Sequence, residues 1–82
     1  MDWKYEDGRI FCDEDGETIA EATYVDKGNG VVDIDHTYIS PRLRGQGAAG
    51  EMMRVVTEYL KSKGLNITAT CSYADAWLEK HK

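Results

Sequence analysis

The segment YISPRLRGQGAAGE, residues 38–51, connects an apolar β-like stretch to an amphipathic stretch with helical spacing. It holds three glycines and two arginines and has few bulky side chains. Glycines let a backbone approach a ligand closely, and the first N–H groups of a helix have no partner within that helix. The helix dipole and the arginine charges both favour an anion at such a place. The segment therefore predicts a cradle for a phosphate or pyrophosphate group.

β-like stretches lead up to the predicted cradle. Residues 1–6 are either a short strand or a packed arm, and residues 9–13 and 17–25 flank Asp15-Gly16, a dipeptide typical of tight hairpins. Residues 31–39 end before Pro41, which lacks the N–H group that a ladder needs. Strict alternation along this last strand places four side chains on one face: Val32, Ile34, His36 and Tyr38.

A helix, a strand and a second helix are predicted after the cradle. The first helix spans about 47–63, and Gly64 is its expected stop. Its predicted buried stripe is Ala49, Met52, Met53, Val56 and Leu60. Residues 65–71 read as a strand, and Ser72 begins a capping-box pattern for a short last helix. The order β-β-β-α-β-α predicts an α+β fold, a minimal sheet with an antiparallel meander and one parallel βαβ step.

Length and composition narrow the class of protein. The chain has 82 residues and a net charge of −5, and 41% of its residues are hydrophobic, so we expect one domain over residues 1–82. No apolar run is long enough to span a membrane, and the first residues do not resemble a signal peptide, so we expect a cytoplasmic protein. The negative charge disfavours nonspecific nucleic-acid binding. Cys12 and Cys71 form neither a disulfide framework nor a zinc motif, and we expect no metal.

The predicted cradle carries a recognisable motif. Residues 42–48, RLRGQGA, fit the pattern Q/R-x-x-G-x-G/A and lie between a strand and the following helix. The flanking segments DHTYI, residues 35–39, and CSY, residues 71–73, complete an HT…RGxG…CSY pattern. The chain thereby resembles the GNAT superfamily of N-acetyltransferases, and in particular its small single-domain YjdJ-like branch. The resemblance covers roughly residues 8–82.

This resemblance implies that the chain binds acetyl-CoA. Amides from Leu43 to Ala48 would hold the pyrophosphate, and the backbone of residues 37–39 would pair with the pantetheine arm. The thioester would then lie where the third and fourth long strands diverge. The residues implied in cofactor binding are Thr37, Tyr38, Ile39, Arg42, Leu43, Arg44, Gly45, Gln46, Gly47, Ala48 and Ala49.

Three side chains are candidates for the chemistry. Cys71 precedes a helix N-terminus that favours its thiolate, so it is a candidate acetyl acceptor in a two-step route. His36 is a candidate base for an amine or for Cys71. The resemblance implies that Tyr73 protonates the departing CoA thiolate. Asp33 and Asp35 are candidates for attracting an ammonium acceptor, and each of these residues can instead be purely structural.

The expected activity is acetyl transfer to an unidentified amine, by direct attack or through acetylated Cys71. Larger GNAT proteins place helices between their first strands, whereas this chain has the Asp15-Gly16 hairpin there. A second departure is Thr70, which stands where the small branch often has proline. The alternatives are a CoA-binding domain with little or no turnover and a plain anion-binding module. A monomer or a weak homodimer is expected.

Overall fold

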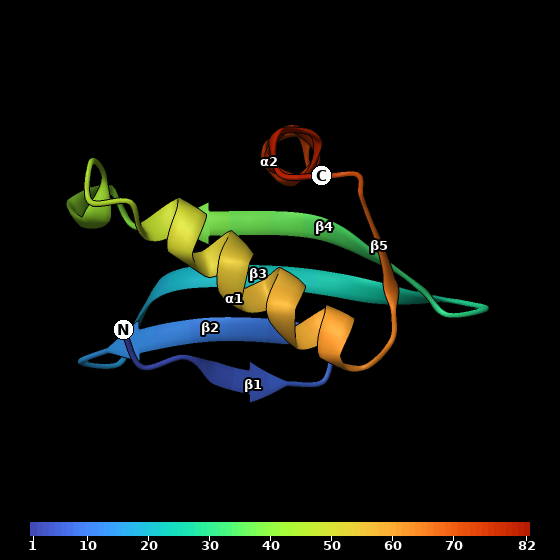
Figure 1. Cartoon of the computed structure of the whole chain (residues 1–82). Helices are drawn as coiled ribbons and strands as arrows, with labels where there is room; N and C mark the ends of the chain where they lie inside the picture. The colour runs from blue at the N-terminus through green and yellow to red at the C-terminus, as the bar shows by residue number, and fades with distance from the viewer.

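The computed structural model describes residues 1–82, which form five strands and two α-helices. Figure 1 shows their arrangement. The predicted α+β fold is confirmed. Residues 4–6 form a short strand, which is one of the two alternatives expected for residues 1–6, and a 3-10 turn lies in the predicted cradle. The elements are β1 (Lys4–Glu6), β2 (Arg9–Glu14), β3 (Glu17–Gly28), β4 (Val31–Ile39), η1 (Pro41–Leu43), α1 (Ala48–Ser62), β5 (Asn66–Ala69) and α2 (Ser72–Lys80).

One sheet contains all five strands in the order β1-β2-β3-β4-β5. The first four strands pair antiparallel, and β5 pairs parallel with β4, as the meander and βαβ step predict. Asp15 and Asn29 have positive φ and precede Gly16 and Gly30, which also have positive φ. Such pairs fit the two-residue hairpin turns whose twist matches that of the strands. The Asp15-Gly16 hairpin prediction is therefore confirmed.

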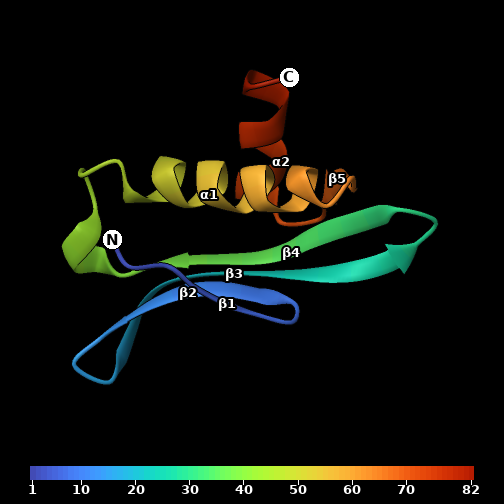
Figure 2. The same cartoon turned by 60° about the horizontal axis from the view of Figure 1, so that its bottom comes forward.

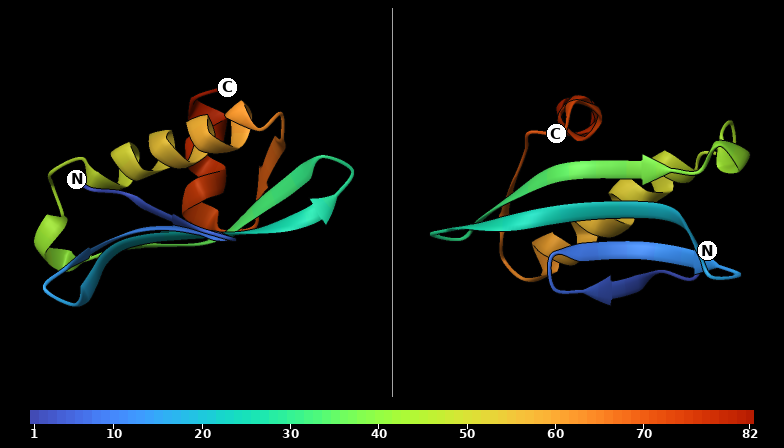
Figure 3. Two further views of the ribbon diagram at one scale, coloured as in Figure 1. Left: turned by 90° about the horizontal axis from the view of Figure 1, so that it is seen from below. Right: turned by 180° about the vertical axis from the view of Figure 1, so that it is seen from behind.

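Both helices lie on the same side of the sheet. Figure 2 shows α1 lying over the sheet and α2 rising beside it, and the rear view in Figure 3 shows the other face of the sheet without a helix over it. Neither helix is long and apolar enough to cross a membrane. The chain thus has a two-layer architecture with one covered and one open sheet face.

The core forms between α1 and the covered face. Met52, Met53, Val56 and Leu60 of the predicted stripe are fully buried. The stripe prediction is wrong at its start, because Ala48 is buried and Ala49 is only half-buried. Each large apolar side chain buried here contributes about 1.5–3 kcal/mol to folding. The strand residues of the core cluster are Ile10, Cys12, Ile19, Ala20, Ala22, Val32 and Ile34.

The predicted face of His36 and Tyr38 is wrong. Thr23 pairs with His36, yet the next residue of β3 pairs with Ile34, so Asp35 is an extra residue in β4. A β-bulge of this kind reverses which side chains face the core beyond it. His36 and Tyr38 are consequently exposed, and Thr37 takes the covered face instead.

The start of α2 also differs from its prediction. The Asp75 N–H donates to the Cys71 carbonyl at 2.9 Å, so Cys71 is the N-cap and Ser72 is the first helical residue. No side chain caps this end, and the expected capping box at Ser72 is wrong. The reason lies upstream: the N–H groups of Thr70 and Cys71 both donate to the Ile34 carbonyl, at 3.1 and 3.2 Å. The strand therefore turns into the helix one residue earlier than the side-chain pattern predicts.

Candidate functional site

The loop between β4 and α1 is a compact turn. The Leu43 N–H donates to the Ser40 carbonyl at 2.9 Å and the Arg44 N–H donates to the Pro41 carbonyl at 3.2 Å. Gly47 caps α1 with φ 74°, in the left-handed region where a side chain is strained. The RGQG motif thus supplies a conformation that brings the chain directly into the first turn of α1.

Five backbone N–H groups between Gly45 and Gly50, at the end of the loop and the start of α1, have no acceptor within the protein. Leu43, Arg44 and Gln46 donate within the loop, and Glu51 is the first helical residue that donates back along the chain, to the Gly47 carbonyl at 3.0 Å. The N–H groups left free are those of Gly45, Gly47, Ala48, Ala49 and Gly50. Free amides at a helix N-terminus favour an anionic ligand. Within the 43–48 range implied by the resemblance, the free amides are therefore those of Gly45, Gly47 and Ala48, and those of Ala49 and Gly50 follow it.

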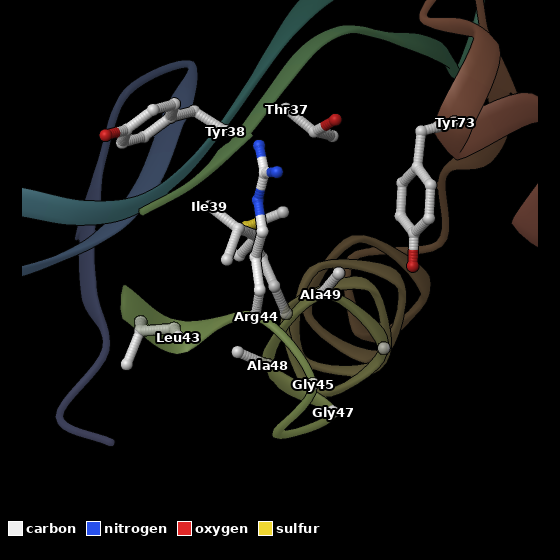
Figure 4. Close-up of a pocket in the computed structure, with 12 residues that line it drawn as sticks. Thr37, Tyr38, Ile39, Leu43, Arg44, Gly45, Gly47, Ala48, Ala49 and Tyr73 are labelled. Atoms are coloured by element: carbon white, nitrogen blue, oxygen red, sulfur yellow. The ribbon is translucent and has the colours of Figure 1, made fainter. Parts of the chain in front are cut away.

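A cavity of about 470 Å³ opens beside these amides. It lies between the end of β4, the loop, the first turn of α1 and the start of α2 (Figure 4). The lining residues are Thr37, Tyr38, Ile39, Leu43, Arg44, Gly45, Gly47, Ala48, Ala49, Gly50, Met52 and Tyr73. Gly50 and Met52 also line the cavity, although they were not among the predicted site residues. Both lie in the first turns of α1, within four residues of the predicted site residue Ala48. A second cavity, between β5 and α2, contains none of the predicted site residues.

The two arginines of the loop have different surroundings. Arg44 reaches from the loop into the cavity toward β4 in Figure 4, and no carboxylate pairs with it. Arg42 lies outside the cavity and forms an ion pair with Glu14 of the β2–β3 hairpin. Gln46 also lies outside and donates from Nε2 to the Arg42 carbonyl at 3.1 Å. Arg44 is therefore the cation available to a ligand in the cavity.

β4 and β5 separate at the inner end of the cavity. Their paired residues end at Ile34 and Ala69, and beyond them the Asp35 bulge turns β4 while Cys71 enters α2. Just before the separation, Asp33 accepts hydrogen bonds from the hydroxyls of Thr68 at 2.8 Å and Thr70 at 2.7 Å. These bonds hold the pKa of the Asp33 carboxyl below its usual value. Asp33 therefore fastens the two strands where they diverge.

Cys71 lies next to Thr37 across this gap. Its Sγ is 3.3 Å from the Thr37 Oγ1, and its side chain is half-buried. Burial raises the pKa of the Cys71 thiol, but hydrogen bonds from the Thr37 hydroxyl and from the amides of Ala74, Tyr73 and Thr37 outweigh it. The resulting pKa is lower than the ordinary thiol value. A lowered pKa increases the thiolate fraction and with it the reactivity of the sulfur.

Tyr73 and His36 lie on different sides of the sheet. Tyr73 lines the cavity together with Thr37. His36 faces the open side, where its Nε2 is 3.6 Å from Oε1 of Glu21 and its side chain is about half exposed. Glu21, which also accepts from the Arg9 guanidinium, was not predicted as a site residue. A cross-strand neighbour of this kind is visible only once the strand register is known.

The two predicted ammonium-attracting carboxylates differ in accessibility. Asp33 is 5% exposed and its oxygens are engaged by two threonines. Asp35 is exposed and accepts from the Thr23 hydroxyl at 2.5 Å. Cys12 is buried in the core, and this burial raises its pKa. Of these three residues, only Asp35 presents a charge to solvent.

Comparison with known proteins agrees with this architecture. Residues 9–82 match the family model of GCN5-related N-acetyltransferases, and the chain belongs to this family. The solution structure of a GCN5-like protein from Staphylococcus aureus is similar, with a TM-score of 0.81 and 33% identity over 98% of this chain and 79% of that one. The resemblance to the GNAT superfamily is thereby confirmed.

Larger enzymes share the fold at lower identity. An IAA acetyltransferase from Bacillus cereus matches with a TM-score of 0.68 and 16% identity over 88% of this chain. The aminoglycoside N-acetyltransferase AAC(6')-Iy, solved in complex with CoA, matches with a TM-score of 0.53 and 24% identity over 74% of this chain. The matched part spans 51% and 52% of those two proteins. This chain therefore corresponds to about half of each.

Proposed function

We propose that residues 1–82 act as one acetyl-CoA-dependent N-acetyltransferase domain in the cytoplasm, with an amine as the acceptor. One observation carries the proposal: five free amides and unpaired Arg44 border a cavity that extends along β4 toward Cys71 and Tyr73. The amides and Arg44 would hold the pyrophosphate through charge-assisted hydrogen bonds. The surroundings of Gly45 and Gly47 are open, because a Cβ added at either position would meet nothing within 4 Å.

The gap between β4 and β5 suits the reactive end of the cofactor. Beyond Ile34, β4 no longer pairs with β5, so the backbone of residues 37–39 would be available to the pantetheine arm on that side, apart from the Thr37 amide that donates to Cys71. The same residues line the cavity. Backbone donors at such a gap can polarise a thioester carbonyl. The thioester would then lie close to the Cys71 sulfur and the Tyr73 hydroxyl.

Two routes from the thioester to the amine fit the residues present. In one, Cys71 accepts the acetyl group and passes it to the amine, while Tyr73 protonates the departing CoA sulfur. In the other, the amine attacks the thioester directly from the open face, where His36 beside Glu21 would accept its proton. The contact of Cys71 with Thr37, which lines the cavity, supports the first route, and the position of His36 on the open side supports the second.

A CoA-binding domain without significant turnover is the second candidate function. The open face of the sheet carries no helix that would enclose an acceptor (Figure 3). An enclosed acceptor would lose translational and rotational freedom, which contributes much of the rate of two-substrate enzymes. An open face would supply less of this effect to a small amine.

Titration with CoA followed by an amine panel tests both candidates. CoA should shift the amide NMR signals of Gly45, Gly47, Ala48, Ala49 and Gly50 more than those of the β3–β4 hairpin tip at 28–30. If those five signals do not move, both CoA-dependent proposals are wrong. If they move, release of free CoA from acetyl-CoA in the presence of an amine supports the enzyme, whereas binding without any release across the panel supports the binding domain.

A further inference from the structure

We propose that Thr37 is a positioning residue for Cys71, donating a hydrogen bond from its hydroxyl to the sulfur and holding that sulfur beside the cavity. This inference rests on the proposed function, because it assigns a role to a second side chain at the same site. The resemblance to the GNAT family gives Thr37 only a backbone role toward pantetheine. The structure adds a role for the side chain.

The contact depends on the bulge in β4. Thr37 and Cys71 are 34 residues apart, and their side-chain atoms Oγ1 and Sγ are 3.3 Å apart. Strict alternation would turn Thr37 toward the open face, but the extra residue Asp35 turns it toward α2. The bond therefore spans the two elements at the place where β4 and β5 have already separated.

Thr37 is the side-chain donor for the sulfur. When Cys71 is a thiolate it can only accept, so the threonine hydroxyl must be the donor. The amides of Tyr73 and Ala74, at the start of α2, are further donors to the sulfur. Together these groups form a neutral set of donors around one anion, comparable to the donors of an oxyanion hole.

Nearby titratable groups do not bond to the sulfur. Asp33 is held by Thr68 and Thr70, His36 faces Glu21 on the other side of the sheet, and the Tyr73 and Asp75 side chains of α2 make no hydrogen bond to Sγ. The core side chains of α1 that pack toward the sheet are apolar apart from Thr57, which bonds to its own helix. Thiolate formation at Cys71 therefore depends on neutral donors, of which Thr37 can be altered by substitution.

The bond would assist both halves of a two-step transfer. In the first, the Cys71 sulfur forms a bond to the acetyl carbon, and the bond from that carbon to the CoA sulfur breaks. The CoA thiolate leaves with the electron pair and takes a proton from the Tyr73 hydroxyl or water. In the second, the amine nitrogen bonds to the acetyl carbon, the Cys71 sulfur leaves as a thiolate, and the ammonium proton passes to water. Stabilising the thiolate makes it a better leaving group in this second step.

Alkylation of Cys71 at different pH values tests the role of Thr37. The full chain is treated with iodoacetamide, and peptide mass spectrometry follows Cys71 and Cys12 separately. Thr37→Val keeps the shape and removes the hydroxyl, so its Cys71 should react about three- to tenfold more slowly at pH 7, with the pH midpoint moved upward. Thr37→Ser should restore the wild-type profile. Buried Cys12 should stay slow in every folded variant, so it reports on folding in the same sample.

Control variants keep the result specific. Thr23→Val removes a hydroxyl on the open face, which bonds to Asp35, and should leave the Cys71 profile unchanged. If Thr37→Val does not fold, Thr37→Ala tests the same loss of the hydroxyl. A folded Thr37→Val or Thr37→Ala protein with the wild-type pH midpoint overturns the proposal. That failure is separate from failure of the proposed function, which would appear as absence of CoA-induced shifts at Gly45 to Gly50.

Discussion

Asp33 accepts a 2.7 Å hydrogen bond from Thr70, directly before β4 and β5 cease to pair. A second bond from Thr68 engages the other carboxylate oxygen. A buried carboxylate with its oxygens occupied in this way joins the two strands at the edge of the candidate site. Its function is therefore structural, and loss of its charge should loosen the gap.

Replacing Asp33 with asparagine should destabilise the fold at neutral pH. The folded pKa of Asp33 is below its ordinary value of 3.8, so its charged form contributes stability that is present above that value. This contribution is lost as the pH falls through the folded pKa. Urea unfolding should show a difference between wild type and Asp33→Asn at pH 7 that narrows below pH 3.8. Asp35→Asn, on the exposed side, should change stability by less than about 0.5 kcal/mol, and an equal effect of both substitutions would contradict the assignment.

Arg44 should matter more than Arg42 for CoA binding. Arg44 enters the cavity without a carboxylate partner, whereas Arg42 is paired with Glu14. A charge-assisted hydrogen bond contributes about 1.5–3 kcal/mol, so Arg44→Ala should weaken CoA binding by about tenfold or more in isothermal titration calorimetry. Arg42→Ala removes an exposed ion pair of about 0–1 kcal/mol and should weaken binding less. The reverse order would show that Arg42 leaves Glu14 to bind the phosphates.

Gly47 and Gly50 should respond in opposite directions to alanine. Gly47 has φ 74°, and an added Cβ would touch nothing within 4 Å, so Gly47→Ala should cost about 1 kcal/mol through backbone strain alone. Gly50 has ordinary helical φ and equally open surroundings, so Gly50→Ala should stabilise α1 by about 0.5–1 kcal/mol. Urea unfolding measures both. Stabilisation by Gly47→Ala would mean that the loop has another conformation in solution.

His36 should affect acetyl transfer without affecting cofactor affinity. It faces the open side of the sheet and does not line the cavity. If an amine is deprotonated there, His36→Asn should lower kcat/KM for the amine by about 10²-fold or more, as for loss of a general base. The dissociation constant for CoA should stay within about twofold, because the substitution removes no contact with the cavity. Loss of a contact that contributes about 1.4 kcal/mol would instead change it tenfold. A changed CoA affinity with unchanged turnover would place His36 outside the chemistry.

Much of the fold could be predicted because local chemistry determined it. A two-residue hairpin turn needs positive φ at both residues, which few residue pairs tolerate. Asp15-Gly16 is such a pair, and it therefore predicted the hairpin directly. The 3.6-residue spacing of Met52, Met53, Val56 and Leu60 identified the buried face of α1. The buried residue in the first turn of α1 was less predictable. Ala48 and Ala49 are equally apolar, and the direction in which the chain enters the helix decides which of them is buried.

The loop of the candidate site could be predicted from the sequence, but the side of the sheet on which each β4 side chain lies could not. The RGQG loop could be predicted from the sequence, because glycine at position 47 readily adopts the left-handed backbone conformation that begins α1. The bulge at Asp35 leaves no pattern in the sequence, because a β-strand with an extra residue differs from a regular strand only in its pairing. His36 and Thr37 therefore had their positions exchanged in the prediction. The separate surroundings of Arg42 and Arg44 depend on Glu14, which is remote in sequence.

The extra residue Asp35 changes which side chains of β4 face α1 and α2, so the strand contributes to the core before Asp35 and to the cavity after it. Before Asp35, alternate side chains build the core; after it, the same alternation turns Thr37 toward the cavity and His36 toward open solvent. Insertion or deletion of one residue at this place would exchange those two side chains without altering either of them. Relatives that differ in length at this position would therefore differ in which group faces the cavity, even where the residues themselves are identical.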